Sequence, residues 1–350
     1  MKKKYLYSLV VFVLLLAIVG ATYYFFKKSP EDNSRKFDLP REELKPVEKQ
    51  MVLRVHRYEQ DLFALSLDSL SEGIERLAQV YPENLIAEAA WQNPDMIFQL
   101  RGYLQDSGIV EIVKKTMTVF PDLSPFLAEM KPALARYLYY FPDAEIPEIY
   151  TLVPGLVLDM PSVYMIDNNL FIHLDLYLGS QTKLYDKYGL PKYISERCDP
   201  KFLAIDCFKK ALVYRHLSDS PAKTLLDAMI FEGKKLYFTE MNFPDRPRQD
   251  IIGYNENKYS WAEAHQFDVW NYLISKNELF STGDKERQIY IEESPFTKRF
   301  SHESPGRIGT FIGWKIVQGF MKKHTEVSLQ QLMQMEDARY ILKESGYKPK

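Results

Sequence analysis

The sequence has 350 residues, with 45 Lys and Arg against 47 Asp and Glu, so its formal net charge is only −2. A nearly neutral chain lacks the basic surface that nucleic-acid binding requires, and we therefore expect no nucleic-acid partner. About 320 residues follow the hydrophobic N-terminal segment, which is enough for one large domain or two closely packed ones.

The N-terminal segment is predicted to be a membrane anchor. Three lysines precede an uncharged run from Tyr5 to Phe26, which as a helix would be roughly 33 Å long, close to the ~30 Å hydrocarbon core of a bilayer. We expect residues 1–28 to form an uncleaved transmembrane anchor or, alternatively, a cleaved signal segment; both would export the rest of the chain. Thr22 stands where a lipoprotein would carry its lipidated cysteine. The prediction is therefore a protein anchor, residues 5–26, in the cytoplasmic membrane, with the domain in the periplasm.

A charged stretch with three prolines follows the anchor. Residues 29–50 contain few apolar side chains and predict a linker, which places the folded domain at residues 51–350. From Val52 to Val80, apolar residues recur mostly every three to five positions, which indicates a helix. Shorter helices are predicted at 83–91, 95–105, 107–119 and 125–140.

The middle of the chain changes to a strand pattern. Ile149 to Val153 is a short apolar strand candidate, and the turn at Asp167 joins Val163–Ile166 to a second strand from Leu170 to Leu178. Alternation along this second strand predicts a core face and an opposite, partly polar face. The predicted fold class is mainly α with a small antiparallel β-hairpin or sheet, α+β.

Helical periodicity returns in the C-terminal part. Gly306, Gly309 and Gly313 recur at three- and four-residue spacing, although glycine inside a helix costs up to ~1 kcal/mol relative to alanine. This pattern predicts that another backbone packs against the same helix face. Helices are predicted at 200–217, 222–236, 257–276, 306–323 and 329–344, the last with a capping box formed by Ser328 and Gln331.

A zinc hydrolase is the enzyme class to test first in a mostly helical chain with one small sheet. Its motif needs two histidines one helical turn apart with a glutamate between them. No two of the six histidines lie within four residues of each other. His302-Glu303 opens the pattern, but Gly306 takes the place of the second histidine and Pro305 would break the helix. No metal ligand, cofactor or catalytic residue is therefore assigned.

Weaker candidates for chemistry remain. Glu232, Glu263 and His265 could converge in a cleft, although each is more simply read as a structural residue of a helix. Cys198 and Cys207, nine residues apart, could form a disulfide outside the cytoplasm or could be two buried thiols.

The turn formed by Pro305, Gly306 and Arg307, continued by Gly309, is predicted to be a signature surface. An arginine beside a helix start is unfavourable for the helix dipole. We therefore expect a carboxylate partner for Arg307, either within the chain or on another protein.

Several segments, taken in order, resemble the gliding-motility lipoprotein GldB family of the Bacteroidetes over roughly residues 145 to 350. The segments that carry the resemblance are Leu174–Gly179, Tyr188–Ile194, Leu225–Phe238, Tyr259–Glu263, Ser294–Thr297, Ser304–Gly309, Ile312–Val317 and Tyr340–Pro349. The resemblance implies a role in the cell envelope, connected with gliding machinery. It also implies a degenerate shell of a helical zinc peptidase, whose metal helix would fall at Ile205–His216. The lipid-attachment cysteine of the family is missing here.

The hypothesis that follows is a non-catalytic envelope protein of the GldB type that works with envelope protein partners. One alternative is a metal-independent or degenerate peptidase-like hydrolase that uses Glu232, Glu263 and His265. Another is a periplasmic peptide-binding module that adds a strand at the hairpin edge.

Overall fold

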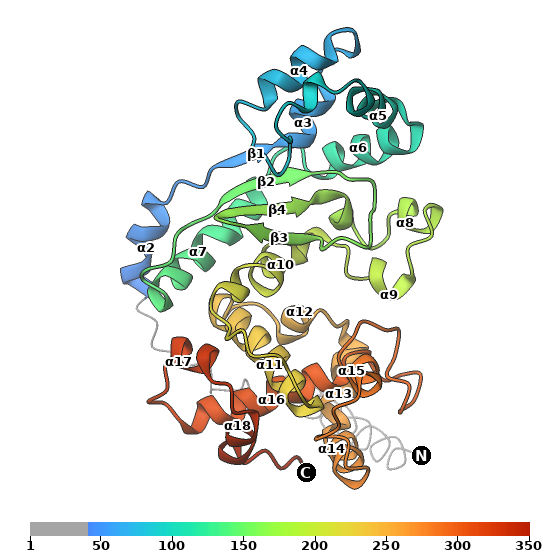
Figure 1. Cartoon of the computed structure of the whole chain (residues 1–350). Helices are drawn as coiled ribbons and strands as arrows, with labels where there is room; N and C mark the ends of the chain where they lie inside the picture. The colour runs from blue at the N-terminus through green and yellow to red at the C-terminus, as the bar shows by residue number, and fades with distance from the viewer. Residues whose placement is uncertain (1–40) are drawn as a thin grey trace, which may run out of the picture. The chain divides into compact units, whose positions relative to one another are not determined.

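The computed structural model describes residues 41–350 (Figure 1). The predicted anchor at 5–26, and the part of the predicted linker before residue 41, lie outside the described residues. The described chain is mainly helical with one small four-stranded sheet, so the predicted α+β class is confirmed. Within residues 41–350, no helix combines the length and the apolar character needed to cross a bilayer.

The described chain opens with a helix where we expected a linker. Helix α2 (Arg41–Gln50) contains Pro46 and packs against α7 (Ser124–Tyr140) with Leu44 buried, so the linker prediction is wrong for residues 41–50. The charged side chains that suggested a linker lie mostly on its exposed face. Strand β1 (Val55–Arg57) follows, inside the stretch that was predicted to be helical throughout.

A first group of helices lies on the β1 side of the sheet (Figure 1). Side-chain caps define two of their starts: Asn93 accepts hydrogen bonds from two backbone N–H groups of α5, and Asp106 does the same for α6. The apolar faces of α3, α4 and α5 pack with Tyr150 and Phe171 of the sheet. The group comprises α3 (Tyr58–Phe63), η2 (Leu67–Ser69), α4 (Leu70–Leu77), η3 (Ala90–Gln92), α5 (Pro94–Gln105) and α6 (Ser107–Val119).

The sheet has the order β1-β2-β4-β3 and is mixed rather than antiparallel. Strand β2 (Glu148–Leu152) pairs in parallel with both β1 and β4 (Asn169–His173), and only β3 (Val163–Ile166) runs antiparallel to β4. The predicted hairpin is therefore present, but two further pairings are parallel.

Strand β4 is shorter than predicted. After His173 the chain turns into a 3-10 helix, η4 (Leu174–Tyr177), in which Asp175 is fully buried. The strand expected from Leu170 to Leu178 therefore ends at His173, the last residue that pairs with β2. The sequence did not indicate this end, because leucines continue at every second position as far as Leu178.

A second group of helices lies on the β3 side of the sheet, where α10 packs against β3 (Figure 1). Capping boxes start α11 at Thr224 and α17 at Ser328, the latter as predicted. Its elements are α8 (Lys183–Lys187), α9 (Lys192–Ser195), η5 (Pro200–Phe202), α10 (Leu203–Lys210), η6 (Leu212–Arg215), α11 (Leu225–Asn242), α12 (Arg248–Ile252), α13 (Glu256–Ala264), α14 (Gln266–Ser275), α15 (Asp284–Tyr290), α16 (Ile308–Lys323), α17 (Leu329–Gln334) and α18 (Ala338–Ser345).

The crossing of α11 and α16 explains the glycine pattern. A Cβ atom placed on Gly313 would lie 1.8 Å from the carbonyl oxygen of Met229, and one placed on Gly233 would lie 2.4 Å from the carbonyl carbon of Gly313. A Cβ atom on Gly309 would lie 3.0 Å from the carbonyl oxygen of Tyr290, the last residue of α15. The predicted packing of a second backbone against this helix face is confirmed.

Candidate functional site

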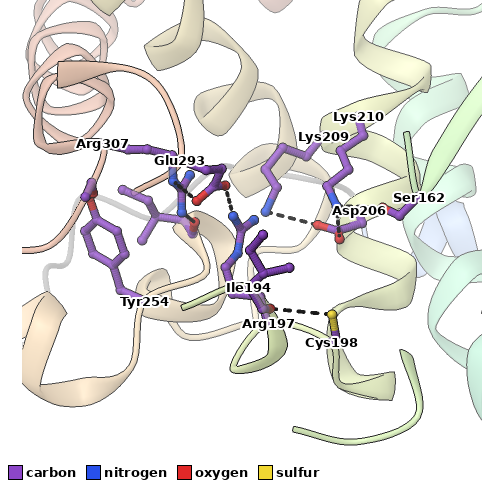
Figure 2. A network of polar contacts seen from close by, with 12 residues as sticks. Ser162, Ile194, Arg197, Cys198, Asp206, Lys209, Lys210, Tyr254, Glu293 and Arg307 are labelled. Atoms are coloured by element: carbon purple, nitrogen blue, oxygen red, sulfur yellow. Dashed lines mark hydrogen bonds and ion pairs between the residues drawn. The ribbon is translucent and has the colours of Figure 1, made fainter. Parts of the chain in front are cut away.

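A network of buried and half-buried charged side chains lies where α9, α10 and the segment between α15 and α16 meet (Figure 2). Two parts can be distinguished. One is centred on Asp206 of α10, and the other is an ion-pair bridge in which Glu293 lies between Arg197 and Arg307.

Helix α10 supplies the first part of the network. It is apolar apart from Asp206, Lys209 and Lys210, whose three- and four-residue spacing places both ammonium groups beside one carboxylate. Lys210 Nζ lies 2.7 Å from Asp206 Oδ2, and Lys209 Nζ lies 3.2 Å from Oδ1. The hydroxyl of Tyr177 donates to Asp206 Oδ2 at 2.9 Å.

These contacts determine the charge states around α10. Burial opposes the charge of Asp206, but Lys210, Lys209 and Arg197 outweigh it and hold the pKa of this carboxyl well below its usual value. Burial lowers the pKa of Lys209 to about 7, against the opposing effect of Asp206. The Lys209 ammonium also donates to the carbonyl oxygen of Ile251 at 3.1 Å, so it is fully enclosed by protein groups.

The second part is a bridge of two arginines and one carboxylate. Glu293 Oε1 accepts from Arg197, and Glu293 Oε2 lies 3.0 Å from Arg307 Nε. Burial, together with the neighbouring charge of Arg307, lowers the pKa of Arg197 to about 10. Two guanidinium groups thus share one carboxylate, an arrangement in which removal of the carboxylate would leave two cations facing each other.

The turn before α16 holds Arg307 in an unusual backbone conformation. Its φ is 58°, in the left-handed region that arginine rarely adopts. The guanidinium compensates by donating to the carbonyl oxygen of Ile252 at 3.0 Å, and the hydroxyl of Tyr254 fixes the turn by donating to Gly306 O at 2.6 Å. Gly306 is required here because a Cβ atom would lie 2.2 Å from Ser294 O.

The predicted signature turn is therefore buried rather than a protruding surface. Pro305, Gly306, Arg307 and Gly309 all lie inside the fold. The carboxylate that lies against Arg307 is Glu293 of the same chain. Gly306 and Arg307 of this turn line a cavity.

Two cavities meet at the Arg197–Glu293 ion pair, because both residues line both of them. The first has a volume of about 340 Å³ and mostly polar or charged walls, with Arg307 among them. The second has a volume of about 260 Å³ and a more apolar wall. That wall includes Leu158, Met160, Leu176 and Ile194.

The wall of the second cavity is positioned by a buried carboxylate. Asp175 Oδ2 accepts hydrogen bonds from the backbone N–H groups of Gly155 at 2.9 Å and of Leu156 at 2.6 Å, which fixes the start of the loop that carries Leu158 and Met160. Burial raises the pKa of Asp175 to about 6, although these two N–H groups act in the opposite direction.

The three predicted cleft residues have separate local partners. Glu232 pairs with Lys235 of its own helix at 2.9 Å, whereas Glu263 pairs with Lys315 of α16 at 2.5 Å. His265 stacks on Trp261 and contacts the carbonyl oxygen of that residue at 2.8 Å. Neither of the two cavities is lined by any of the three. Each of the three is therefore accounted for by a local structural contact.

The two cysteines are free and buried, so the disulfide that they could form is not present in the structure. Cys198 directs its thiol to the carbonyl oxygen of Ile194 at 3.5 Å, within the wall of the second cavity. Burial raises the pKa of the Cys198 thiol to about 11, which disfavours the reactive thiolate. Among residues 41–350, no group of three or more His, Cys, Asp and Glu side chains is arranged to hold a metal ion.

Sequence reasoning identified Arg307 but missed the residues around it. Arg197 and Glu293 are far apart in the chain and lie in irregular segments, so no spacing rule connects them. One local signal was available: Asp206, Lys209 and Lys210 interrupt an otherwise apolar helix at ion-pair spacing. Three charged residues on a helix that must be buried indicate a polar network in the interior.

Comparison with known protein families agrees with the family resemblance that the sequence motifs indicated. The family model described as gliding motility protein GldB matches residues 41–349. Searches of curated proteins and of solved structures found no match. The match starts at the first residue of α2 and includes both the sheet and the charge network. The chain therefore belongs to the GldB family of gliding motility proteins.

Proposed function

We propose that this protein is a non-catalytic component of the cell envelope that supports gliding motility by binding a partner group at the Arg197–Glu293–Arg307 bridge. Family membership supports the connection with gliding. The observation that carries the binding role is the pair of enclosed arginines that share one carboxylate where two cavities meet.

The surroundings of the charged groups on α10 favour binding over catalysis. A general acid or base needs a pKa near the working pH and access to a substrate. Asp206 stays ionised, and Lys209, although its pKa of about 7 would suit proton transfer, is enclosed and bonded to a carbonyl group. Arginines whose aliphatic stems are enclosed and that line an accessible cavity are instead typical of sites that bind an anionic group.

The hydrolase alternative receives less support. Glu232 and Glu263 each form an ion pair with a different lysine, and His265 is stacked on a tryptophan. Strand addition at the hairpin remains a separate prediction; β3, the strand it would use, is a sheet edge of four residues.

Placement in the envelope belongs to the same proposal. We infer that residues 5–26 anchor the chain in the cytoplasmic membrane and that residues 41–350 face the periplasm. Protease treatment of spheroplasts that carry a C-terminally tagged chain tests this topology. The tag should be degraded in intact spheroplasts; a tag that stays protected until the membrane is dissolved would contradict it.

Complementation in a gliding bacterium that lacks its own copy of the protein tests the binding role. Arg307→Lys keeps the charge but loses the guanidinium contacts to Glu293 and Ile252. We expect this variant to accumulate normally yet to restore colony spreading poorly. Arg215→Lys is the matched control, because Arg215 bonds Glu145 O and Asn168 outside the network.

Two outcomes would contradict the proposal. If Arg307→Lys and the Arg197→Lys, Arg307→Lys double variant both restored full spreading, the bridge would have no role in gliding. Stoichiometric zinc in the purified chain, with a peptidase activity that is lost on chelation, would show that the protein is an enzyme and not a binding component.

A further inference from the structure

We propose that the two cavities form one recognition site for the C-terminus of a polypeptide that ends in an apolar residue. In this arrangement Glu293 occupies the place of the terminal carboxylate while the site is empty. The inference rests on the proposed binding function and names the chemical class of the partner. Three features of the site carry it.

The first feature is the unequal exposure of the bridge. The side chain of Glu293 is 46% exposed, whereas those of Arg197 and Arg307 are 19% and 11% exposed. Arg307 is also fixed by the carbonyl oxygen of Ile252 and by the ring of Tyr254, 5.5 Å from its guanidinium carbon. The carboxylate is therefore the partner that can leave, and the two arginines would stay in place to receive another carboxylate of the same geometry.

The second feature is the apolar cavity directly beside the bridge. Leu158 and Met160 are 43% and 44% exposed and line the cavity together with Leu176 and Ile194. Exposed apolar surface around a concavity is stabilised by the entry of an apolar group. Because Arg197 and Glu293 line this cavity too, the apolar group must be attached close to the carboxylate, as a C-terminal side chain is.

The third feature is the polar lining of the other cavity. Ser180, Glu196, Asp199 and Asn255 offer hydroxyl, carboxylate and amide oxygens within a volume of about 340 Å³. These are acceptors for the backbone N–H groups of the residues that precede the terminus. Part of their capacity is used within the chain, because Asp199 and Asn255 each accept one backbone N–H and Glu196 accepts from the Lys258 ammonium. A single-chain fatty acid would match the arginines and the apolar cavity but could donate no further hydrogen bond to these oxygens. The polar cavity thus favours a peptide.

The experiment uses the full chain in lipid nanodiscs and two pools of random heptapeptides. One pool has free C-terminal carboxylates and the other has C-terminal amides. Peptides that the protein retains are identified by mass spectrometry. We expect retention from the free-acid pool only, with leucine, methionine, valine and phenylalanine enriched at the last position, because an amide cannot replace the charge of Glu293.

Three variants make the test specific to the bridge. Glu293→Gln removes the internal competitor, so a peptide retained by the natural chain should bind it about tenfold more tightly. Arg307→Lys should weaken binding at least about tenfold, and Leu158→Asp should remove the preference for an apolar last residue. Arg215→Lys, outside the site, should bind as the natural chain does. Circular dichroism and thermal unfolding show whether each variant is folded.

The proposal is overturned by equal retention of the amidated pool, or by no retention of either pool on the natural chain and on folded Glu293→Gln. It is also overturned if decanoate binds at this site, with sensitivity to Arg307→Lys, while no peptide is retained; the site would then take an anionic amphiphile. These failures leave the proposed function standing as long as Arg307→Lys still impairs spreading. If spreading is unaffected, the proposed function fails whatever the peptide result.

Discussion

Asp175 illustrates how one residue can position a wall of the site at the expense of stability. Its carboxylate is fully buried and accepts two backbone N–H bonds from the loop that carries Leu158 and Met160. Burial nevertheless dominates and raises its pKa from 3.8 to about 6. The folded protein thus binds the proton of Asp175 more tightly than the unfolded chain does.

The pH dependence of stability follows from that shift. As the pH rises from about 4 to 6 the unfolded chain loses this proton first, so Asp175 lowers the free energy of unfolding, and above pH 6 the full penalty applies. Asp175→Asn keeps an oxygen acceptor for the loop without the charge. We expect the variant to match the natural protein at pH 4 and to be more stable at pH 7, by at most about 3 kcal/mol.

Urea unfolding at several pH values measures this difference. Asp68→Asn, the same substitution at an exposed position, is the control. An Asp175→Asn variant that is equally destabilised at pH 4 and pH 7 would mean that the loop contacts, and not the buried charge, dominate.

At the residue scale, the sequence predicted a carboxylate for Arg307 but not which one. Helix electrostatics required a partner near Arg307, and that requirement is local. The choice of Glu293, and the second pairing to Arg197, depend on how α9 and the segment after α15 fold against each other. Such tertiary pairings produce no periodic pattern in the sequence. Glu232, Glu263 and His265 were chosen for their residue types alone, and local partners account for each.

At the scale of elements, the contact between α11 and α16 is the most demanding in the fold. Gly313→Ala would place a methyl group 1.8 Å from Met229 O, a backbone atom that cannot move without shifting α11. We expect a loss of about 3 kcal/mol or more in the free energy of unfolding. Gly102→Ala in α5 is the matched control, because no atom lies within 4 Å of the added methyl group.

Chemical denaturation of both variants checks this prediction. Gly102→Ala should be neutral or stabilising by up to about 1 kcal/mol, since alanine is the better helix former at an exposed position. Similar small effects for both substitutions would mean that the two helices can separate slightly without loss of packing.

The agreement and the errors of the predicted helix and strand boundaries have physical causes. Predictions for α5, α6 and α7 agree closely with the structure, because apolar periodicity coincides with a side-chain cap at the start of α5 and α6 and with a proline in the first turn of α7. The helix predicted from residue 222 starts at Leu225 instead, since Thr224 forms the capping box of α11. Strand β1 was missed because three residues are too short to establish a two-residue period against a surrounding helical pattern.

At the scale of the whole molecule, α2 belongs to the folded unit. Leu44 and Met51 are both 6% exposed, and α2 lies along α7. A chain that starts at residue 41 should therefore unfold at a higher temperature than one that starts at residue 52, since burying one such side chain contributes about 1.5–3 kcal/mol. Thermal unfolding of the two chains tests this; equal melting temperatures would restore the linker prediction for residues 41–50.

The parallel pairing of β1 with β2 also governs the order in which the chain can fold. Val55 pairs with Ile149, a separation of 94 residues (149 − 55), so the edge of the sheet cannot close until five helices have been made and brought together. Closing so long a loop carries an entropy cost before any ladder bond forms. In pulsed hydrogen exchange during refolding, we expect the β1 amides that bond within the sheet to be protected after those of α7. A newly made chain would thus carry an unpaired strand until residue 149 has emerged, and a chaperone that covers extended segments would meet its substrate in this interval.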